Sequence, residues 1–273
     1  MENAMELIRM RRSVRTFDGR LLPPFASEAL RAFAAKAENP WGVPVEIRIL
    51  PAGEDGLTSP VIAGETAYAG AKVSPGPAAE LGCGYSFEWF MLEALGLGLG
   101  SVWLGGTLNR PAFAKAMELG EGELMPCVTP LGYPAKKMSL KETVMRKATR
   151  ADTRKPFGEL FFDGDFHTPL TPEAAGPLSE ALEAVRLAPS AVNKQPWRVL
   201  RREGTCFFYK KGDKGFVNPE TGDLQKIDLG IAVAHFALAA ESAGLAFRLT
   251  EEGPGLPAPE GWEFIAACRA EAI

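Results

Sequence analysis

Two long apolar segments dominate the hydrophobic pattern of this 273-residue sequence. Residues 78–97 and 224–243 are apolar on nearly every face of a helix, so each is predicted to be a central, buried helix rather than an amphipathic surface helix. Around the first, shorter apolar periods predict helices at 2–11, 27–37 and 110–119 and strands at 44–50, 66–73, 100–104 and 124–131. The Pro- and Gly-rich residues 251–261 are predicted to form a loop.

The two apolar segments belong to a longer internal repeat. The tetrapeptide SEAL begins at Ser27 and again at Ser179, an offset of 152, and a Pro-Trp pair recurs at an offset of 156. The long helices align at an offset of 146, and VRTFDG matches RKPFGE at an offset of 140. Short sequence matches of this kind also occur between unrelated helical α/β units, which is the alternative explanation. Four matches in the same order favour duplication. We therefore predict two related halves, 1–150 and 151–273, each with the order helix, helix, strand, strand, long helix, strand.

The composition is that of a globular protein, with 46% hydrophobic and 23% charged residues. The formal net charge of −4 excludes neither an anionic nor a cationic ligand, because local charge decides binding. Four cysteines without CxxC spacing are expected to be free and buried, which argues against a secreted disulfide scaffold. The apolar run 90–106 contains Glu93 and five glycines, so it predicts no membrane span. Without an apolar leader, a cytoplasmic location is expected.

A basic segment, RRSVR, follows the first predicted helix. Arg11, Ser13 and Arg15 alternate, so in an extended chain their side chains point the same way. Two guanidinium groups and a hydroxyl on one edge suit a phosphate group. Taken alone, however, the segment is better explained as a solvated basic helix end. A nucleic-acid-binding arm would need interleaved aromatic residues or a longer basic run, and has neither.

The segment APSAVNKQPW, residues 188–197, provides short polar side chains in a turn. Pro189 is expected to end the preceding helix. The side chains of Ser190, Asn193 and Gln195 can each donate and accept hydrogen bonds. This suits the polar edge of a flat ring such as a flavin. The alternative is a capped helix-to-strand turn.

The glycine-rich segment 96–106 resembles a dinucleotide-binding fingerprint only superficially. Such a fingerprint follows a strand and opens a helix, whereas this segment closes a helix and is predicted to open a strand. Gly105 and Gly106, after the apolar SVWL, would allow the backbone to approach a flat ligand closely.

The segment LGYPAKK follows the last predicted strand of the first half. Its two lysines, Lys136 and Lys137, would add positive charge near a phosphate. Taken alone, the segment is better explained as an ordinary surface turn.

Together, RRSVRTF, APSAVNKQPW, GLGSVWLGG and GYPAKK resemble signatures of the nitroreductase superfamily over nearly the whole chain. The resemblance implies an α+β fold with mainly antiparallel sheets around central helices, and FMN bound where two subunits meet. In ordinary nitroreductases the Pro-Ser-x-x-Asn loop follows the arginine arm in the same copy. Here the first copy has only AENPW, at 37–41, and the loop stands in the second. The chain therefore resembles the duplicated single-chain branch of the family, a pseudo-dimer with one FMN site.

The resemblance also implies which residues hold FMN. Arg11, Ser13 and Arg15, with Arg12, would bind the phosphate and ribityl oxygens. The tandem Lys136-Lys137 would add to the phosphate site, although it departs from the family's Lys-x-Arg. Further FMN contacts are implied at Gly105 and Gly106, near flavin N5, and at Pro189, Ser190, Ala191 and Asn193, bordering the ring.

The function implied is that of an FMN-dependent NAD(P)H oxidoreductase with ping-pong hydride transfer through flavin N5. Its partners would be NADH or NADPH and a small nitroaromatic, quinone or similar acceptor, without nucleic acid or membrane. No catalytic side chain or metal is expected, since hydride transfer through the flavin needs no side-chain nucleophile and neither a Ser-His-Asp pattern nor metal-ligand spacing is evident. His235, one of two histidines, is interpreted as a buried core histidine. The alternatives are an FMN sensor or carrier without turnover, a dehydrogenase or dehalogenase on the same fold, or a structural protein without flavin. The resemblance is compatible with a monomer that forms a pseudo-dimer, and leaves further dimerisation open.

Overall fold

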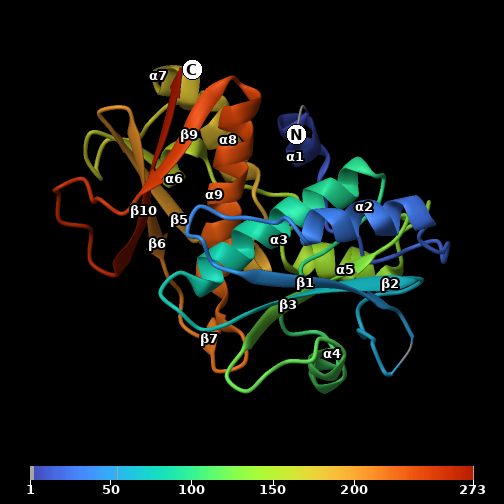
Figure 1. Ribbon diagram of the computed structural model, residues 1–273. Coiled ribbons are helices and arrows are strands. Elements are labelled where there is room, and N and C mark those ends of the chain that lie inside the picture. Colours follow the sequence, from blue (N-terminus) through green and yellow to red (C-terminus); the bar gives the residue numbers. More distant parts are fainter. Residues whose placement is uncertain (1–2, 54, 273) are drawn as a thin grey trace.

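A computed structural model describes residues 3–53 and 55–272. Two helices form its centre, α3 (Ala79–Gly96) and α9 (Leu224–Ser242), and both are buried over most of their length. In Figure 1, α3 lies along a three-stranded sheet and α9 lies beside a five-stranded sheet. The two long segments predicted to be central helices are therefore confirmed.

The two central helices cross in very close contact. A Cβ atom added at Gly84 would lie 2.2 Å from the carbonyl oxygen of Ile227, and one added at Gly230 would lie 2.1 Å from that of Leu81. No larger residue fits at either position, because real Cβ atoms do not approach backbone oxygens so closely. The two contacts are reciprocal. At the repeat offset of 146, Gly84 of α3 corresponds to Gly230 of α9, and Leu81 corresponds to Ile227.

The three-stranded sheet belongs to the first half of the chain. Its order is β1 (Val45–Pro51), β2 (Ala67–Val73) and β3 (Leu124–Leu131), and both pairings are antiparallel. Strand β2, in the middle, is buried at every position. The helices of this half are α1 (Ala4–Met10), α2 (Pro24–Ala34), α4 (Arg110–Ala116) and α5 (Leu140–Ala148).

The five-stranded sheet belongs to the second half. Its order is β4 (Phe161–Asp163), β5 (Trp197–Arg202), β6 (Thr205–Lys211), β10 (Trp262–Ala272) and β9 (Leu245–Thr250), and only the β4–β5 pair is parallel. The smaller elements of this half are α6 (Phe157–Leu160), α7 (Pro172–Ala175), η1 (Gly176–Leu178), α8 (Ser179–Leu187), η2 (Ala191–Asn193), β7 (Val217–Asn218) and β8 (Gly222–Asp223). The prediction of mainly antiparallel sheets around central helices is confirmed.

The predicted strand at 100–104 is wrong. Gly100 and Leu104 form only isolated bridges to the strand β3 region, and between them the Val102 N–H donates to the side-chain oxygen of Thr129, at 3.0 Å, rather than to a carbonyl. That side-chain bond interrupts the backbone ladder, so a continuous strand does not form.

The predicted helices are confirmed with shifted ends. The helix expected at 27–37 begins at Pro24, because proline suits the first helical position. The helix expected at 110–119 ends at Ala116, and of the helix expected at 2–11, residue 2 lies outside the described residues. Helix α5 was not predicted, although the Ser139 side chain caps it by accepting the N–H of Glu142 at 3.1 Å.

All four cysteines are free and buried, as predicted. Across the part of the chain that the structure describes, no helix combines the length and apolar character needed to cross a membrane.

Candidate functional site

A cavity of about 390 Å³ lies where segments from both halves of the chain meet. This volume falls in the range of roughly 300–1,000 Å³ that is usual for small-molecule sites. Nine of the twelve residues predicted from the sequence line it: Arg11, Ser13, Arg15, Gly105, Gly106, Pro189, Ser190, Ala191 and Asn193. The N-terminal arm and the loop of the second half, 180 residues apart in sequence, thus share one cavity.

The N-terminal arm, residues 11–15, reaches the cavity as an extended segment. The Val14 N–H donates to the Ser101 carbonyl at 2.9 Å, and the Arg15 carbonyl accepts the N–H of Ala63 at 3.0 Å. Because an extended chain turns alternate side chains to opposite faces, Arg11, Ser13 and Arg15 share the cavity side.

Both arginines of the arm keep unpaired nitrogens inside the protein. The Nε and Nη1 atoms of Arg11 and of Arg15 are buried, and no hydrogen-bond partner for them exists among residues 3–53 and 55–272. Burial lowers the pKa of both guanidinium groups, and the neighbouring Arg146 lowers it further. Glu142 opposes that shift in the pKa of Arg15, and Glu88 opposes it for Arg11, but Glu88 lies 3.8 Å from Arg11 Nε, beyond hydrogen-bond distance. This end of the cavity therefore favours an anion that accepts several hydrogen bonds.

Glu88 belongs to a buried polar cluster behind Arg11. Its Oε2 accepts the indole N–H of Trp103 at 2.7 Å, and its Oε1 lies 2.9 Å from His235 Nε2. The other ring nitrogen of His235 lies 2.9 Å from the carbonyl oxygen of Ala184. His235 is thus a core histidine with both nitrogens partnered, as predicted, and the side chain of Glu88 lies behind Arg11.

The loop from the second half is strained. Val192, Asn193 and Gln195 have φ angles of 51°, 55° and 52°, in the left-handed region that non-glycine residues seldom adopt. Local bonds hold this shape: the Asn193 N–H donates to the Ser190 carbonyl, and the Gln195 N–H donates to Ser190 Oγ, both at 2.9 Å. Strained backbone of this kind concentrates at functional sites.

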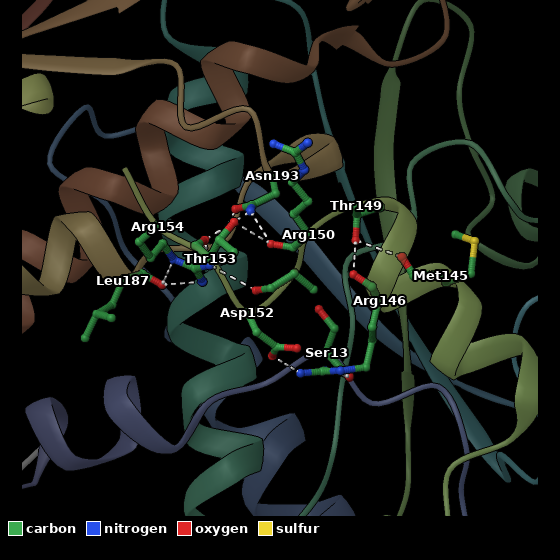
Figure 2. Close-up of polar contacts among 11 residues, drawn as sticks. Ser13, Met145, Arg146, Thr149, Arg150, Asp152, Thr153, Arg154, Leu187 and Asn193 are labelled. Carbon is green, nitrogen blue, oxygen red and sulfur yellow. Dashed lines mark hydrogen bonds and ion pairs between the residues drawn. The ribbon is translucent and has the colours of Figure 1, made fainter. Parts of the chain in front are cut away.

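Asn193 uses its side chain to hold the connector between the halves, residues 149–156. Its amide nitrogen donates to the carbonyls of Arg150, at 2.7 Å, and Thr153, at 3.1 Å, as Figure 2 shows. Its Oδ1 accepts from Arg154, at 3.4 Å, and from Gln195, at 3.3 Å. Asn193 therefore lines the cavity, but its side-chain donors are engaged with the connector.

Arg154, on the connector, is a cavity residue that sequence reasoning missed. Its guanidinium donates to carbonyl oxygens, including that of Leu187 at 3.1 Å (Figure 2). Burial, with Arg11 and Arg186 nearby, lowers its pKa to about 10, and Asp152 only partly opposes the shift. The available signal was its place in RKPFGE, the segment that the repeat matches to the arm. Arg154 adds a third positive charge to the cavity.

Three predicted residues, Arg12, Lys136 and Lys137, are exposed and do not line the cavity. Arg12 lies on the opposite side of the extended arm from its neighbours. The turn with the lysines pairs with the arm further along, where the Ala135 N–H donates to the Thr16 carbonyl at 3.0 Å. This pairing directs the turn away from the cavity.

The remaining wall of the cavity is largely apolar. It includes Val102, Trp103, Phe216, Ile227 and Ile231. Such a wall excludes water and suits a flat, partly apolar ligand.

Arg110 fixes the glycine turn at the cavity. Its guanidinium donates to the carbonyl of Gly105 and, at 2.7 Å, to that of Met125, and its Nε lies 3.4 Å from a carboxylate oxygen of Glu220. One arginine therefore ties the Gly105–Gly106 turn to strand β3 and to the second half of the chain.

The fold and the cavity define an α+β protein, built on two central helices, with a positively charged ligand site that both halves line. The pattern of the family described as "Putative TM nitroreductase" matches residues 3–240, and the chain therefore belongs to that family. None of the curated proteins matches the chain.

Many solved structures match the chain, and two of them illustrate the shared fold. A "putative nitroreductase" from Thermotoga maritima is 18% identical, with a TM-score of 0.64, over 97% of this chain and 93% of its own. A protein described as "the oxidoreductase containing FMN" is 16% identical, with a TM-score of 0.50, over 61% of this chain and 93% of its own. The nitroreductase-like fold predicted from the sequence is confirmed.

Proposed function

We propose that the chain is an FMN-dependent NAD(P)H oxidoreductase of the nitroreductase type, acting on a small nitroaromatic, quinone or similar acceptor. Membership of the nitroreductase family supports an oxidoreductase. The structural neighbour described as containing FMN supports that flavin as the cofactor.

The observation that carries the proposal is the set of buried guanidinium nitrogens in the cavity that lack hydrogen-bond partners. Arg11 and Arg15 each bury two nitrogens that lack partners in the described part of the chain. Unmade hydrogen bonds of buried charged groups are costly, so a ligand that makes them gains affinity. A phosphate accepts several such bonds at once and compensates the charge, which fits the phosphate of FMN.

The other cavity residues have distinct roles in this proposal. Ser13 would bind the ribityl chain, and the backbone N–H groups of Gly105 and Gly106 would face the flavin ring. Ser190 and Ala191 would border the ring from the second half. Bound FMN would accept a hydride from the nicotinamide and deliver it to the acceptor, which predicts ping-pong kinetics. The protein itself would position the ring and exclude water, without a catalytic side chain.

We also propose that residues 1–150 and 151–273 arose by duplication and form a fused pseudo-dimer. The reciprocal crossing of α3 and α9 supports this, because a two-fold axis between related halves would produce matched glycine contacts at Gly84 and Gly230.

The proposal is tested by FMN affinity in arginine variants. Arg11→Ala or Arg15→Ala is expected to weaken FMN binding about 10- to 100-fold, since each charge-assisted hydrogen bond contributes about 1.5–3 kcal/mol. Riboflavin, which lacks the phosphate, should lose much less affinity. Arg12→Ala is the matched control, because this neighbouring arginine is exposed, and it should bind FMN like the wild type. Equal FMN affinity in all four proteins, measured by flavin fluorescence, would refute the phosphate site.

Turnover is tested separately by anaerobic reduction. NADH or NADPH should bleach the absorbance of bound FMN, and adding an acceptor should restore it. Bound flavin that neither nucleotide bleaches would instead favour a sensor or carrier.

A further inference from the structure

Asp228 is a buried carboxyl group in the cavity that the proposed function leaves without a role. It lies in the second turn of α9, is 3% exposed, and lines the cavity. Its Oδ1 accepts the backbone N–H of Ala191 at 2.9 Å. Its Oδ2 is also buried, but it has no hydrogen-bond partner within residues 3–53 and 55–272. One oxygen therefore fixes the loop, and the other is available to a ligand.

The surroundings of Asp228 favour the neutral, protonated carboxyl. Burial raises its pKa well above the ordinary value for aspartate, and the nearby Asp223 raises it further, whereas the Ala191 N–H only partly opposes the shift. Its neighbours along α9 on the cavity wall, Leu224, Ile227 and Ile231, are apolar. No Lys, Arg or His of the described chain forms an ion pair with it. A protonated carboxyl is a hydrogen-bond donor, unlike the carboxylate.

We propose that Asp228 is a further cofactor-binding residue, whose neutral carboxyl donates a hydrogen bond from Oδ2 to an acceptor atom on the ring system of bound FMN. This inference rests on the proposed function. The unpaired nitrogens of Arg11 and Arg15 provide donors for the phosphate, and in the described chain neither arginine forms an ion pair with Asp228. The ring carries neutral acceptor atoms, which suit a neutral donor.

The proposed hydrogen bond has a consequence for the flavin potential. Reduction increases the electron density of the ring, so a donor binds the reduced ring more tightly than the oxidised ring. By thermodynamic linkage, a residue that favours reduced FMN raises its midpoint potential. A residue that only fixes the loop through Ala191 would affect both redox states equally and leave the potential unchanged.

The test compares Asp228→Ala with Asp228→Asn in the FMN-loaded protein. Asp228→Asn keeps the shape, the acceptor for Ala191 and a donor, so its potential should stay close to that of the wild type. Asp228→Ala should weaken reduced FMN about tenfold more than oxidised FMN, which lowers the midpoint potential by about 30 mV for a two-electron couple. Asp228→Ala with bound FMN and an unchanged potential would overturn the inference.

A second measurement covers the case in which Asp228→Ala does not fold. Infrared difference spectra of the wild type on FMN reduction should show a protonated-carboxyl band that shifts, and Asp228→Asn should lack this band. The absence of such a band in the wild type would also overturn the inference. Failure of the wild type to bind FMN at all would instead refute the proposed function, so the two failures are distinguishable.

Discussion

Val192 shows at the scale of one residue how the cavity loop stores strain. It is β-branched, has a φ of 51°, and is 62% exposed. Burial of its side chain therefore offsets little of the backbone strain. The left-handed conformation costs a non-glycine residue about 1–2 kcal/mol, whereas glycine adopts it freely. Val192→Gly is therefore expected to raise the free energy of unfolding by about 0.5–1 kcal/mol, measured by urea denaturation.

A matched control for Val192 lies on helix α5. Val144 is similarly exposed, at 64%, but it lies within a helix, where glycine is unfavourable. Val144→Gly should lower the free energy of unfolding by about 0.5–1 kcal/mol. If both substitutions destabilise the protein alike, the loop is not strained.

Individual site residues could be predicted from the sequence where local backbone geometry alone decides which way their side chains point. The alternation of Arg11, Ser13 and Arg15 holds because the arm is extended, and the same alternation explains the exposure of Arg12. Arg154 and Asp228 were not predicted, because their places in the cavity depend on the path of the connector and on the packing of α9. The repeat, which matches the RKPFGE segment of Arg154 to the arm, was a signal for Arg154, and Asp228 had no such signal.

The elements were predicted best where burial follows directly from composition. Helices α3 and α9 lack a polar face, so their central place was readable from the sequence. The predicted strand at 100–104 was wrong because one hydrogen bond, from Val102 to the Thr129 side chain, interrupts the ladder. A bond between residues 27 positions apart leaves no local signal.

The crossing of α3 and α9 makes a prediction at the scale of the elements. Gly84→Ala or Gly230→Ala places a methyl group against a backbone carbonyl of the other helix, and such overpacking costs about 1–3 kcal/mol. Gly96→Ala is the control in α3, because a Cβ atom added there would lie 3.8 Å from Leu7 Cδ1, an ordinary van der Waals distance. The control should be neutral or slightly stabilising, since alanine favours a helix. The measurement is the midpoint temperature of thermal unfolding. Equal midpoints for Gly84→Ala, Gly230→Ala and Gly96→Ala would contradict the close crossing.

At the scale of the whole molecule, the proposed duplication implies that the two halves have diverged where a second site would need the same groups. After α3 the chain reaches the Gly105–Gly106 turn at the cavity, whereas after α9 it enters β9, whose backbone pairs with β10. Opposite Arg15 in the repeat stands Lys155, which forms an ion pair with Glu159 at 3.0 Å. Lys155 thus has a carboxylate at ion-pair distance, which leaves less charge for a phosphate.

This divergence predicts one FMN per chain. In place of the Ser190–Asn193 loop the first half has only AENPW, where the Asn39 side chain closes a turn by bonding both the N–H and the carbonyl of Val43, at 3.1 and 2.7 Å. Protein saturated with FMN, freed of excess flavin and then denatured should release about one equivalent, measured by absorbance against protein concentration. Arg11→Ala should reduce that amount, whereas Lys155→Ala should not. Two equivalents, or a loss on Lys155→Ala, would show that the second half keeps a site of its own.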